Sequence, residues 1–597
     1  MTSSSRYRLL AAATLLLCLT AASSGALDQL NFQVQSTDKT LAADLKAASG
    51  LLASQAAKRT NALELVADAR AEYGKLIAAL YARGYYGPVI HVLVDGREAS
   101  GIAPLNAPST IKTIVVTVDP GAQFTFSRAE IAPLADKTEL PPGFASGQIA
   151  ESGLVQTAVA ASIDGWRALG YAKARVSGQD LVANHDTATL SAAIGIDRGP
   201  RLRFGPLTIK GDDRMRVERI RAIAGYPEGA RFNPEDEDLV ADRLRRTGVF
   251  SSVSLTEDDA ITAPDLLGVT ADLAEAKRRR YTFGAEIASA DGAKLSASWL
   301  DRNVRGGGER LEFTSEISGI GAQSGGADYS LGVTYDRPAT LSPDTELNLG
   351  ASISQVNDVD NVAKIATLSV GFTEYFNKTL TATAALAFTG TDGRDERGSY
   401  SYRAIELPIG ATWDRRDSKT DPTRMFYINA AAKPFYGFGN TDNGIRLTFD
   451  ARGYKGLGDN RVILAARIQG GAVLGADILD TPRDDLFFSG GGGTVRGQEY
   501  QSLGVTVDEG GTPVTIGGNQ FVAGSLEARV KVTEKIGIVG FADIGLVGAA
   551  GGESDWQAGA GIGVRYATGV GPVRLDLAVP VHSGEGLQVY VGLGQAF

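Results

Sequence analysis

The chain has 597 residues and a formal net charge of −10, and 73 of its residues are glycine. This length is more than one compact core usually accommodates, so we expect several domains or one large closed architecture. A nucleic-acid-binding protein needs a basic face that neutralises phosphates, and the acidic balance argues against a nucleic-acid partner. After the N-terminus the sequence lacks apolar runs of membrane-helix length, which disfavours a helical membrane protein.

Residues 1–26 have the composition of a secretory signal peptide. Arg6 and Arg8 form a positive flank, residues 9–19 form an apolar core, and residues 24–26 offer a cleavage site of small residues. The only cysteine, Cys18, lies in the apolar core, and its lipidation is a less favoured alternative. Cleavage would leave a mature chain with neither disulfides nor thiolate metal ligands.

Residues 27–276 contain a unit that recurs about every 80 residues. In each unit a helical pattern ends at a glycine that we expect to adopt a left-handed conformation. These glycines are Gly84, Gly170 and Gly248. A second marker, Asp-x-Gly between two alternating strands, occurs at Asp119 and again at Asp197. Because both markers share one period, chance similarity within a generic α+β region is disfavoured. We predict three α+β domains, each ordered strand, helix, helix, strand, strand, over residues 27–122, 123–201 and 202–276.

Apolar and polar side chains alternate over residues 277–597. In one stretch, the apolar residues Leu526, Ala528 and Val530 alternate with Glu527, Arg529 and Lys531. In the last stretch one face carries Leu587, Val589, Val591, Leu593 and Phe597. Strands with one apolar and one polar face predict a transmembrane antiparallel β-barrel with lipid outside and water inside, and the length suits about 16 strands. A soluble β-sandwich also alternates, but this region is long for one sandwich.

Four short motifs lie within this alternating region. The first is the triplet Val495, Arg496 and Gly497, which follows a run of glycines. The second is a hairpin motif of Asp414, Arg416, Asp417 and Pro422, with Met425 where a glycine is expected. The third, residues 301–311, is rich in glycine, and we expect it to form a hairpin after the first barrel strand because tight turns need positive φ. The fourth is the C-terminal strand with Gly592, Gly594 and Phe597.

These motifs resemble those of the outer-membrane assembly superfamily that includes BamA, TamA and the two-partner secretion transporters, whose barrels are of the bacterial surface antigen type. The resemblance implies that the three α+β units are polypeptide-transport-associated (POTRA) domains and that a long loop folds into the barrel lumen. It also implies that Arg496 on this loop contacts acidic residues of the wall, because a confined guanidinium needs carboxylate partners. In this sequence Gln498 and Gln595 occupy places where the family has aromatic residues.

The number of repeats favours one branch of the superfamily. BamA-like proteins typically carry five POTRA domains and two-partner transporters two, whereas TamA-like proteins carry three. By this resemblance the chain is the TamA-type outer-membrane component of a translocation and assembly module, with the repeats in the periplasm. Its implied partners are a TamB-like inner-membrane-anchored protein, unfolded outer-membrane or autotransporter clients, and outer-membrane lipids. A BamA-like general insertase and a two-partner secretion transporter stay as alternatives, and a passive channel is less favoured.

The glycines of the last strand suggest where the barrel opens. Gly592 and Gly594 pack no side chain, and glycine weakens the interior of a strand, so we expect a lateral seam between residues 280–290 and 587–597. A closed barrel must join its first strand to its last, and a client could add its own strand at this edge by β-augmentation.

We expect no catalytic residues, no metal site and no cofactor, so the protein is not predicted to be an enzyme. The histidines, His91, His185 and His582, are scattered without metal-ligand spacing. The glycine run at residues 490–493 is not followed by the Lys-Ser/Thr pair of a phosphate-binding loop, so loop flexibility explains it better. The sequence also lacks a Gly-x-Ser-x-Gly nucleophile elbow.

Overall fold

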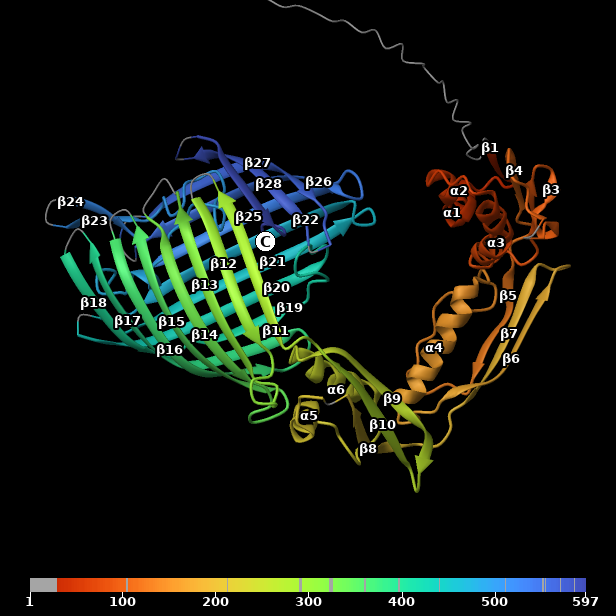
Figure 1. Cartoon of the computed structure of the whole chain (residues 1–597), viewed down its shortest axis with the longest axis horizontal. Helices are drawn as coiled ribbons and strands as arrows, with labels where there is room; N and C mark the ends of the chain where they lie inside the picture. Colours follow the sequence, from red (N-terminus) through yellow and green to blue (C-terminus); the bar gives the residue numbers. More distant parts are fainter. Residues whose placement is uncertain are drawn as a thin grey trace, which may run out of the picture. The chain divides into compact units, whose positions relative to one another are not determined.

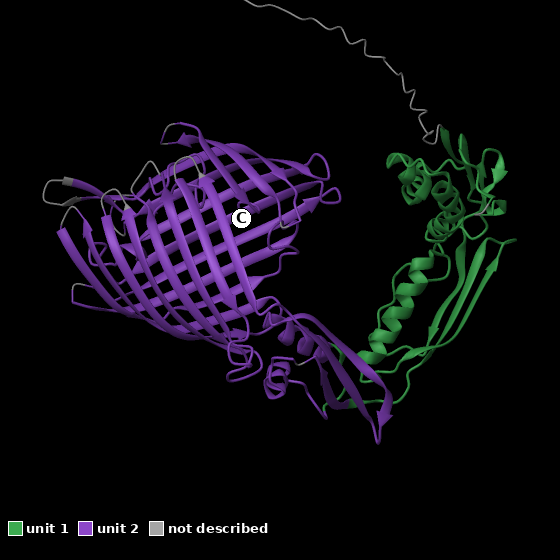
Figure 2. Cartoon of the chain, viewed as in Figure 1, with its two compact units in different colours: residues 1–203, 230–234 green, residues 204–229, 235–597 purple. Residues whose placement is uncertain are grey.

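The computed structural model describes residues 29–597 except 104–105, 212, 289–291, 322–325, 359–360, 396–397, 440, 510–511, 550–551, 553, 570, 583 and 585. The expected signal peptide therefore lies outside the described residues. The chain divides into two compact units, residues 1–203 with 230–234 and residues 204–229 with 235–597 (Figure 2). No helix in the described ranges is both long enough and apolar enough to cross a membrane.

In the described residues, the first unit begins with a domain of three α-helices and a four-stranded sheet of order β1-β4-β2-β3 (Figure 1). Its elements are β1 (Gln29–Val34), α1 (Lys39–Ala48), α2 (Gly50–Ala56), α3 (Ala62–Tyr81), β2 (Val89–Val94), β3 (Arg97–Glu98) and β4 (Thr113–Asp119). Fully buried Leu45, Leu76 and Ile114 join the helices to the sheet. The sequence predicted two helices, but Ser49 caps a separate short helix, its side chain accepting a hydrogen bond from the backbone of Leu52.

The second domain has a three-stranded sheet of order β5-β7-β6 and, within the described residues, a single α-helix. Its elements are β5 (Thr125–Ala132), α4 (Ser152–Ala168), β6 (Arg175–Asn184) and β7 (Thr189–Asp197). The predicted pair of helices is therefore wrong here. The segment before α4 contains Pro133, Pro141 and Pro142, which lack the N–H groups that a helix interior needs.

The third domain, in which the sheet has the order β8-β10-β9, follows the predicted element order. Its elements are β8 (Arg203–Lys210), α5 (Val217–Ala224), α6 (Pro234–Arg246), β9 (Phe250–Thr262) and β10 (Leu266–Glu275). The three glycines that were expected to end helical patterns have positive φ values of 80°, 96° and 67° at Gly84, Gly170 and Gly248. The left-handed conformation predicted at each repeat is confirmed.

A closed antiparallel barrel follows the three α/β domains. Seventeen named strands form it, but β18 and β19 are two parts of one strand, since both lie between β17 and β20, so the barrel has sixteen strands, as predicted. The strands are β11 (Arg279–Ala288), β12 (Gly292–Asp301), β13 (Arg310–Ile320), β14 (Asp328–Arg337), β15 (Thr345–Asp358), β16 (Asn361–Tyr375), β17 (Leu380–Asp395), β18 (Gly398–Glu406), β19 (Ile409–Asp414), β20 (Met425–Phe438), β21 (Gly444–Leu457), β22 (Val462–Leu474), β25 (Gln520–Lys531), β26 (Ile536–Gly548), β27 (Ser554–Tyr566), β28 (Val573–His582) and β29 (Gln588–Leu593).

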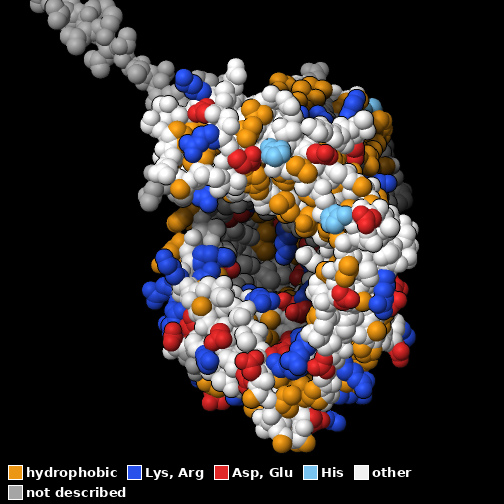
Figure 3. All heavy atoms as spheres, turned by 90° about the vertical axis from the view of Figure 1, so that its right-hand side faces the viewer, with side chains coloured by type: hydrophobic (Ala, Val, Ile, Leu, Met, Phe, Trp, Pro, Cys, Tyr) orange, Lys and Arg blue, Asp and Glu red, His pale blue; other side chains and the backbone are white. Residues whose placement is uncertain are grey.

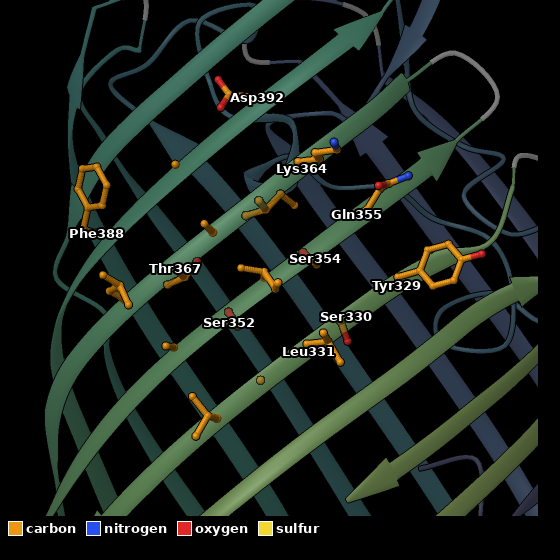
Figure 4. A pocket seen from close by; sticks show the side chains of 18 of the residues that line it. Tyr329, Ser330, Leu331, Ser352, Ser354, Gln355, Lys364, Thr367, Phe388 and Asp392 are labelled. Atoms are coloured by element: carbon orange, nitrogen blue, oxygen red, sulfur yellow. The ribbon is translucent and has the colours of Figure 1, made fainter.

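The two faces of the barrel strands have opposite character. On β25, Leu526 is 65% exposed, whereas its neighbour Glu527 is 3% exposed, so the apolar residues point outward and the charged ones inward. A shallow depression of about 870 Å³ on the outer face includes the exposed Leu331 and Phe388 (Figure 4). On the face of the molecule seen in Figure 3, basic and acidic side chains are interspersed rather than gathered by sign.

The third domain is attached to the turns at one end of the barrel. Arg243 on α6 donates to both carboxylate oxygens of Asp344 in the β14–β15 turn, over 3.0 and 2.5 Å, and Arg246 donates to the same carboxylate over 3.1 Å. The backbone N–H of Arg216 donates to Gly306 over 2.9 Å. Gly306 lies in the hairpin of residues 301–311, which joins β12 to β13. The prediction that this hairpin follows the first strand is wrong, because β11 and β12 both fit in the alternating stretch before it.

Candidate functional site: the lumen loop and the barrel seam

A long loop between β22 and β25, residues 475–519, folds into the barrel and carries the hairpin of β23 (Val505–Glu509) and β24 (Thr512–Ile516). Phe487 of this lumen loop stacks on the inward-facing Phe521 of β25, with ring centroids 5.8 Å apart. Val505 packs in the same buried cluster. The loop therefore occupies the lumen and contacts the inner wall.

Arg496 lies at the centre of this loop and is nearly inaccessible to solvent. Its Nε and Nη2 donate to the two carboxylate oxygens of Asp543 on β26, over 2.7 and 2.9 Å, and its Nη1 donates to Glu527 on β25 over 2.6 Å. The guanidinium also lies 3.6 Å from the ring centroid of Phe541. The bidentate contact with Asp543 fixes both the position and the orientation of the Arg496 guanidinium, whereas an ammonium group would act only as a point charge.

The contacts of Arg496 extend into a larger group of buried charges. Glu527 also accepts a hydrogen bond from Arg529 over 2.8 Å, and Asp576 on β28 pairs with Arg565 on β27. Together the group has three guanidinium and three carboxylate groups, contributed by the lumen loop and four strands, so its formal charges cancel. Burial of charges is costly unless they are paired, and here each carboxylate has at least one arginine partner.

The backbone around Arg496 lies close against the last barrel strands. Gly497 has φ +93°, and a Cβ there would come within 2.6 Å of the carbonyl oxygen of Val579. Its N–H donates to the Tyr590 hydroxyl on β29 over 3.2 Å. Gln498, in the place of the family's aromatic residue, donates from its amide to the carbonyls of Ala558 and His582 over 2.8 and 3.0 Å. These two hydrogen bonds pair the buried side-chain amide of Gln498 with backbone carbonyl groups of the barrel wall.

The contact between the first and last strands is short. Strand β11 pairs with β12 at every residue from Arg279 to Ala288, but with β29 only at Ile287 and Ala288 within the described residues. Residues 279–286 therefore have no pairing strand on the seam side in the described part of the chain. The paired residues of β11 and β29 lie within residues 280–290 and 587–597, and a lateral seam that opens between those ranges stays a prediction.

The C-terminal residues differ from the sequence prediction. Strand β29 ends at Leu593, and Gly594, with φ +89°, lies just beyond it rather than in it. Phe597 does not share the outer face with Leu593: it is buried in the lumen against Tyr454 and Ala465. Its carbonyl oxygen accepts a hydrogen bond from Arg529 over 3.0 Å. The left-handed glycine turns the chain inward, and the alternation therefore ends before the chain does.

The hairpin motif forms the turn between β19 and β20. Asp414 binds Arg416 through two hydrogen bonds of 2.9 and 2.8 Å, and Asp417 accepts the backbone N–H of Thr423 over 2.9 Å. Pro422 is buried in the same turn. Met425 has φ +72°, the left-handed conformation that the expected glycine would adopt without strain. The turn therefore has the backbone conformation expected of a glycine, although methionine occupies position 425.

Several residues of the site were missed at the sequence level, including Arg529, Arg565 and the three carboxylates. They occupy inward positions of strands that alternate clearly, so a search for charged residues on the polar faces would have found them. Which of them meet Arg496 depends on how β25 to β28 align, and that alignment comes from the structure. In the described ranges, no group of His, Cys, Asp and Glu side chains is arranged to hold a metal ion.

A sixteen-stranded barrel with an apolar outer face and a charged lumen, preceded by three α/β domains, defines the class of transmembrane β-barrel proteins with N-terminal soluble domains. Residues 303–597, just under half of the chain, match the model of the Omp85 superfamily domain, so this part of the chain is similar to that domain. The chain is an outer-membrane β-barrel with N-terminal periplasmic POTRA domains.

Individual relatives agree with this assignment. The chain is 23% identical over 456 residues to the outer membrane protein assembly factor BamA of Neisseria meningitidis serogroup B, a match that covers 70% of this chain and 55% of that protein. The chain thus spans about half the length of this curated relative. Among solved structures, BamA from Haemophilus ducreyi lacking POTRA domains 1-3 has a TM-score of 0.60 at 18% identity, covering 79% of this chain and 100% of that one. CdiB from Acinetobacter baumannii has a TM-score of 0.51 at 11% identity, covering 80% and 90%. At these identities the two structures show a shared fold.

Proposed function

We propose that this protein is the outer-membrane component of a translocation and assembly module that inserts or translocates β-barrel and autotransporter proteins by strand addition at the seam between β11 and β29. The observation that carries the proposal is the unequal pairing of β11. Residues 279–286 offer backbone N–H and C=O groups on the seam side that no strand of the described chain uses. An incoming strand satisfies these groups by pairing with them, which is β-augmentation.

The lumen loop supports insertion over passive conduction. Phe487 and Val505 fill part of the lumen, and Arg496 anchors the loop to the wall beside the last strands. A pore that conducts solutes needs an open path through the lumen. Gly497 and Gln498 contact β27 to β29, so the loop braces the side of the barrel that borders the seam.

The seam is tested by closing it with a disulfide. Ile287→Cys with Val591→Cys joins the two paired strands across the seam, and Ala285→Cys with Leu295→Cys joins β11 to β12 as a matched control. We expect the seam disulfide to stop insertion of a β-barrel client into vesicles that contain the protein, reduction to restore it, and the control disulfide to have no effect. Full insertion with the seam closed would contradict the proposed function.

The translocation-module assignment rests on the three POTRA domains, and a partner that is anchored in the inner membrane follows from it. Crosslinkers placed in cells between Gly84 and Val92 of the first domain should capture a long, β-rich, TamB-like protein, identified by mass spectrometry. Capture of outer-membrane lipoproteins would instead support a BamA-like general insertase, to whose family members the chain is similar in sequence. Capture of one secreted protein would support a two-partner transporter.

A further inference from the structure

An ion pair lies across the seam at the point where its backbone pairing ends. Ile287 pairs with Val591, and the next positions along the two strands are Glu286 and Gly592, which face the lumen. Arg574 on β28 is paired in register with Gly592 on β29. Its Nη2 donates to Glu286 Oε1 on β11 over 3.2 Å. The arginine side chain therefore crosses the width of β29 and joins the strand behind it directly to β11.

Gly592 leaves the space through which this arginine passes. A Cβ at residue 592 would lie 2.9 Å from Arg574 Nε and 3.3 Å from Nη2, both closer than ordinary contact allows. Gly592 does not have a positive φ, so its backbone conformation does not by itself require glycine. The other inward positions of β29 carry the large side chains of Gln588 and Tyr590. Glycine at this one inward position therefore fits a steric need, the passage of Arg574.

The charges around the pair alternate in sign from strand to strand. Glu286 is paired in register with Lys294 on β12, and Lys294 binds Glu316 on β13 over 2.8 Å. In the described part of the chain, the contact between Arg574 and Glu286 is the one ion pair that joins β11 to β28 or β29. The Arg574 side chain is 13% exposed and that of Glu286 is 50% exposed. Water and salt compete with a pair that is open on one side, so it can hold the seam reversibly.

We propose that Arg574 is a positioning residue for the seam, and we call its ion pair with Glu286 the clasp. This ion pair passes over Gly592 and holds β11 beside β29 where the backbone pairing ends. It breaks when the seam opens. The role of the clasp in seam opening rests on the proposed function. The ion pair itself belongs to the barrel without a client. The clasp also gives Gly592 a different role from the one expected from the sequence, which was to weaken the strand. In the clasp the glycine allows a side chain to reinforce the seam.

The strength of the clasp is tested by the rate of disulfide formation across the seam in the double variant Ile287→Cys and Val591→Cys. The rate is measured in purified protein in lipid vesicles without a client. Arg574→Ala and Glu286→Gln should each slow this reaction by about 1.5-fold to fivefold, the range for a partly exposed ion pair. Glu286→Arg combined with Arg574→Glu should recover much of the rate, because the attraction is restored with its direction reversed. Gly592→Ala should slow the reaction although Arg574 and Glu286 are both present.

Salt provides a readout that general loss of packing would not change. Raising the salt concentration should slow disulfide formation with Arg574 in place and have little effect in Arg574→Ala. Arg452→Ala, which removes an inward arginine of β21 that binds Asp450, should leave the rate unchanged. Folding of each variant is checked by its heat-dependent migration in electrophoresis. If Arg574→Ala does not fold, Glu286→Gln tests the clasp, because it alters a side chain that is half-exposed. Unchanged rates in Glu286→Gln and Gly592→Ala would overturn the clasp.

The two proposals fail in different ways. If the clasp variants leave the rate unchanged while the closed disulfide still stops client insertion, the clasp is rejected and the proposed function is retained. If the closed disulfide leaves insertion intact while the clasp variants slow its formation, the clasp is retained as a property of the barrel and the proposed function is rejected.

Discussion

Arg496→Ala is the substitution with the largest expected effect on the lumen network. It removes one of three guanidinium groups and leaves Asp543 without a charged partner, because Glu527 still binds Arg529 and Asp576 still binds Arg565. Removing one partner of a buried ion pair typically costs 3–5 kcal/mol, mostly for the charge left behind. Since only one carboxylate loses its partner, we expect a loss near the lower limit, about 3 kcal/mol of unfolding free energy.

Urea titration of the protein in lipid vesicles measures this loss, and insertion of a β-barrel client measures function in the same preparation. Arg496→Lys should be intermediate, because an ammonium group keeps the charge but cannot bind both oxygens of Asp543 as a fork. Arg496→Ala with Asp543→Asn should recover stability but not function, since the loop has still lost its anchor. Arg452→Ala is the matched control, because Arg467 continues to bind Asp450. A loss under about 1 kcal/mol with normal insertion would refute the role of Arg496 as the anchor of the loop.

Three further changes test other parts of the structure. Phe597→Ala should lower the unfolding free energy by about 2 kcal/mol because the buried ring is lost, and an unchanged urea midpoint would show that the C-terminus is not held in the lumen. Met425→Gly should raise stability by about 1 kcal/mol by relieving the left-handed φ, and an equal gain in Met425→Ala would contradict this cause. Burial alone would raise the pKa of Asp344, but hydrogen bonds from Arg243 and Arg246 lower it below the ordinary value of 3.8. The Asp344 carboxylate therefore stabilises the contact of the third domain with the barrel at neutral pH, and this stabilisation is lost as the pH falls below 3.8. Protection of α6 from hydrogen exchange should decrease over the same pH range. The decrease should be smaller in Asp344→Asn, which has no carboxylate to titrate.

The barrel could be predicted well from the sequence because each strand has lipid on one face and a charged lumen on the other. That contrast produces the period-two pattern of residues such as Leu526 and Glu527, and it is a property of each strand alone. The pattern fails at the C-terminus, where Phe597 has the right spacing for the outer face but is buried in the lumen. Alternation assumes an unbroken strand, and Gly594 breaks it.

The candidate site was only half visible from the sequence. The triplet at residues 495–497 identified Arg496, since a short motif is local. Its partners Asp543 and Glu527 come from two strands, and the residues that brace Gly497 and Gln498 come from three others, so their identity depends on strand alignment. The helices of the first two domains were mispredicted for a related reason: Ser49 and the prolines before α4 act on local backbone geometry that apolar spacing does not register.

The central claim is that a client strand pairs with the free edge of β11. A photocrosslinking residue at Phe283 lies on the unpaired part of this edge, whereas one at Ala297, its register partner on β12, lies on the same outer face but away from the seam. With a client stalled during insertion, the account predicts capture of a client strand from residue 283 and none from residue 297. Equal capture from both positions, or none from residue 283, would contradict strand addition at this seam.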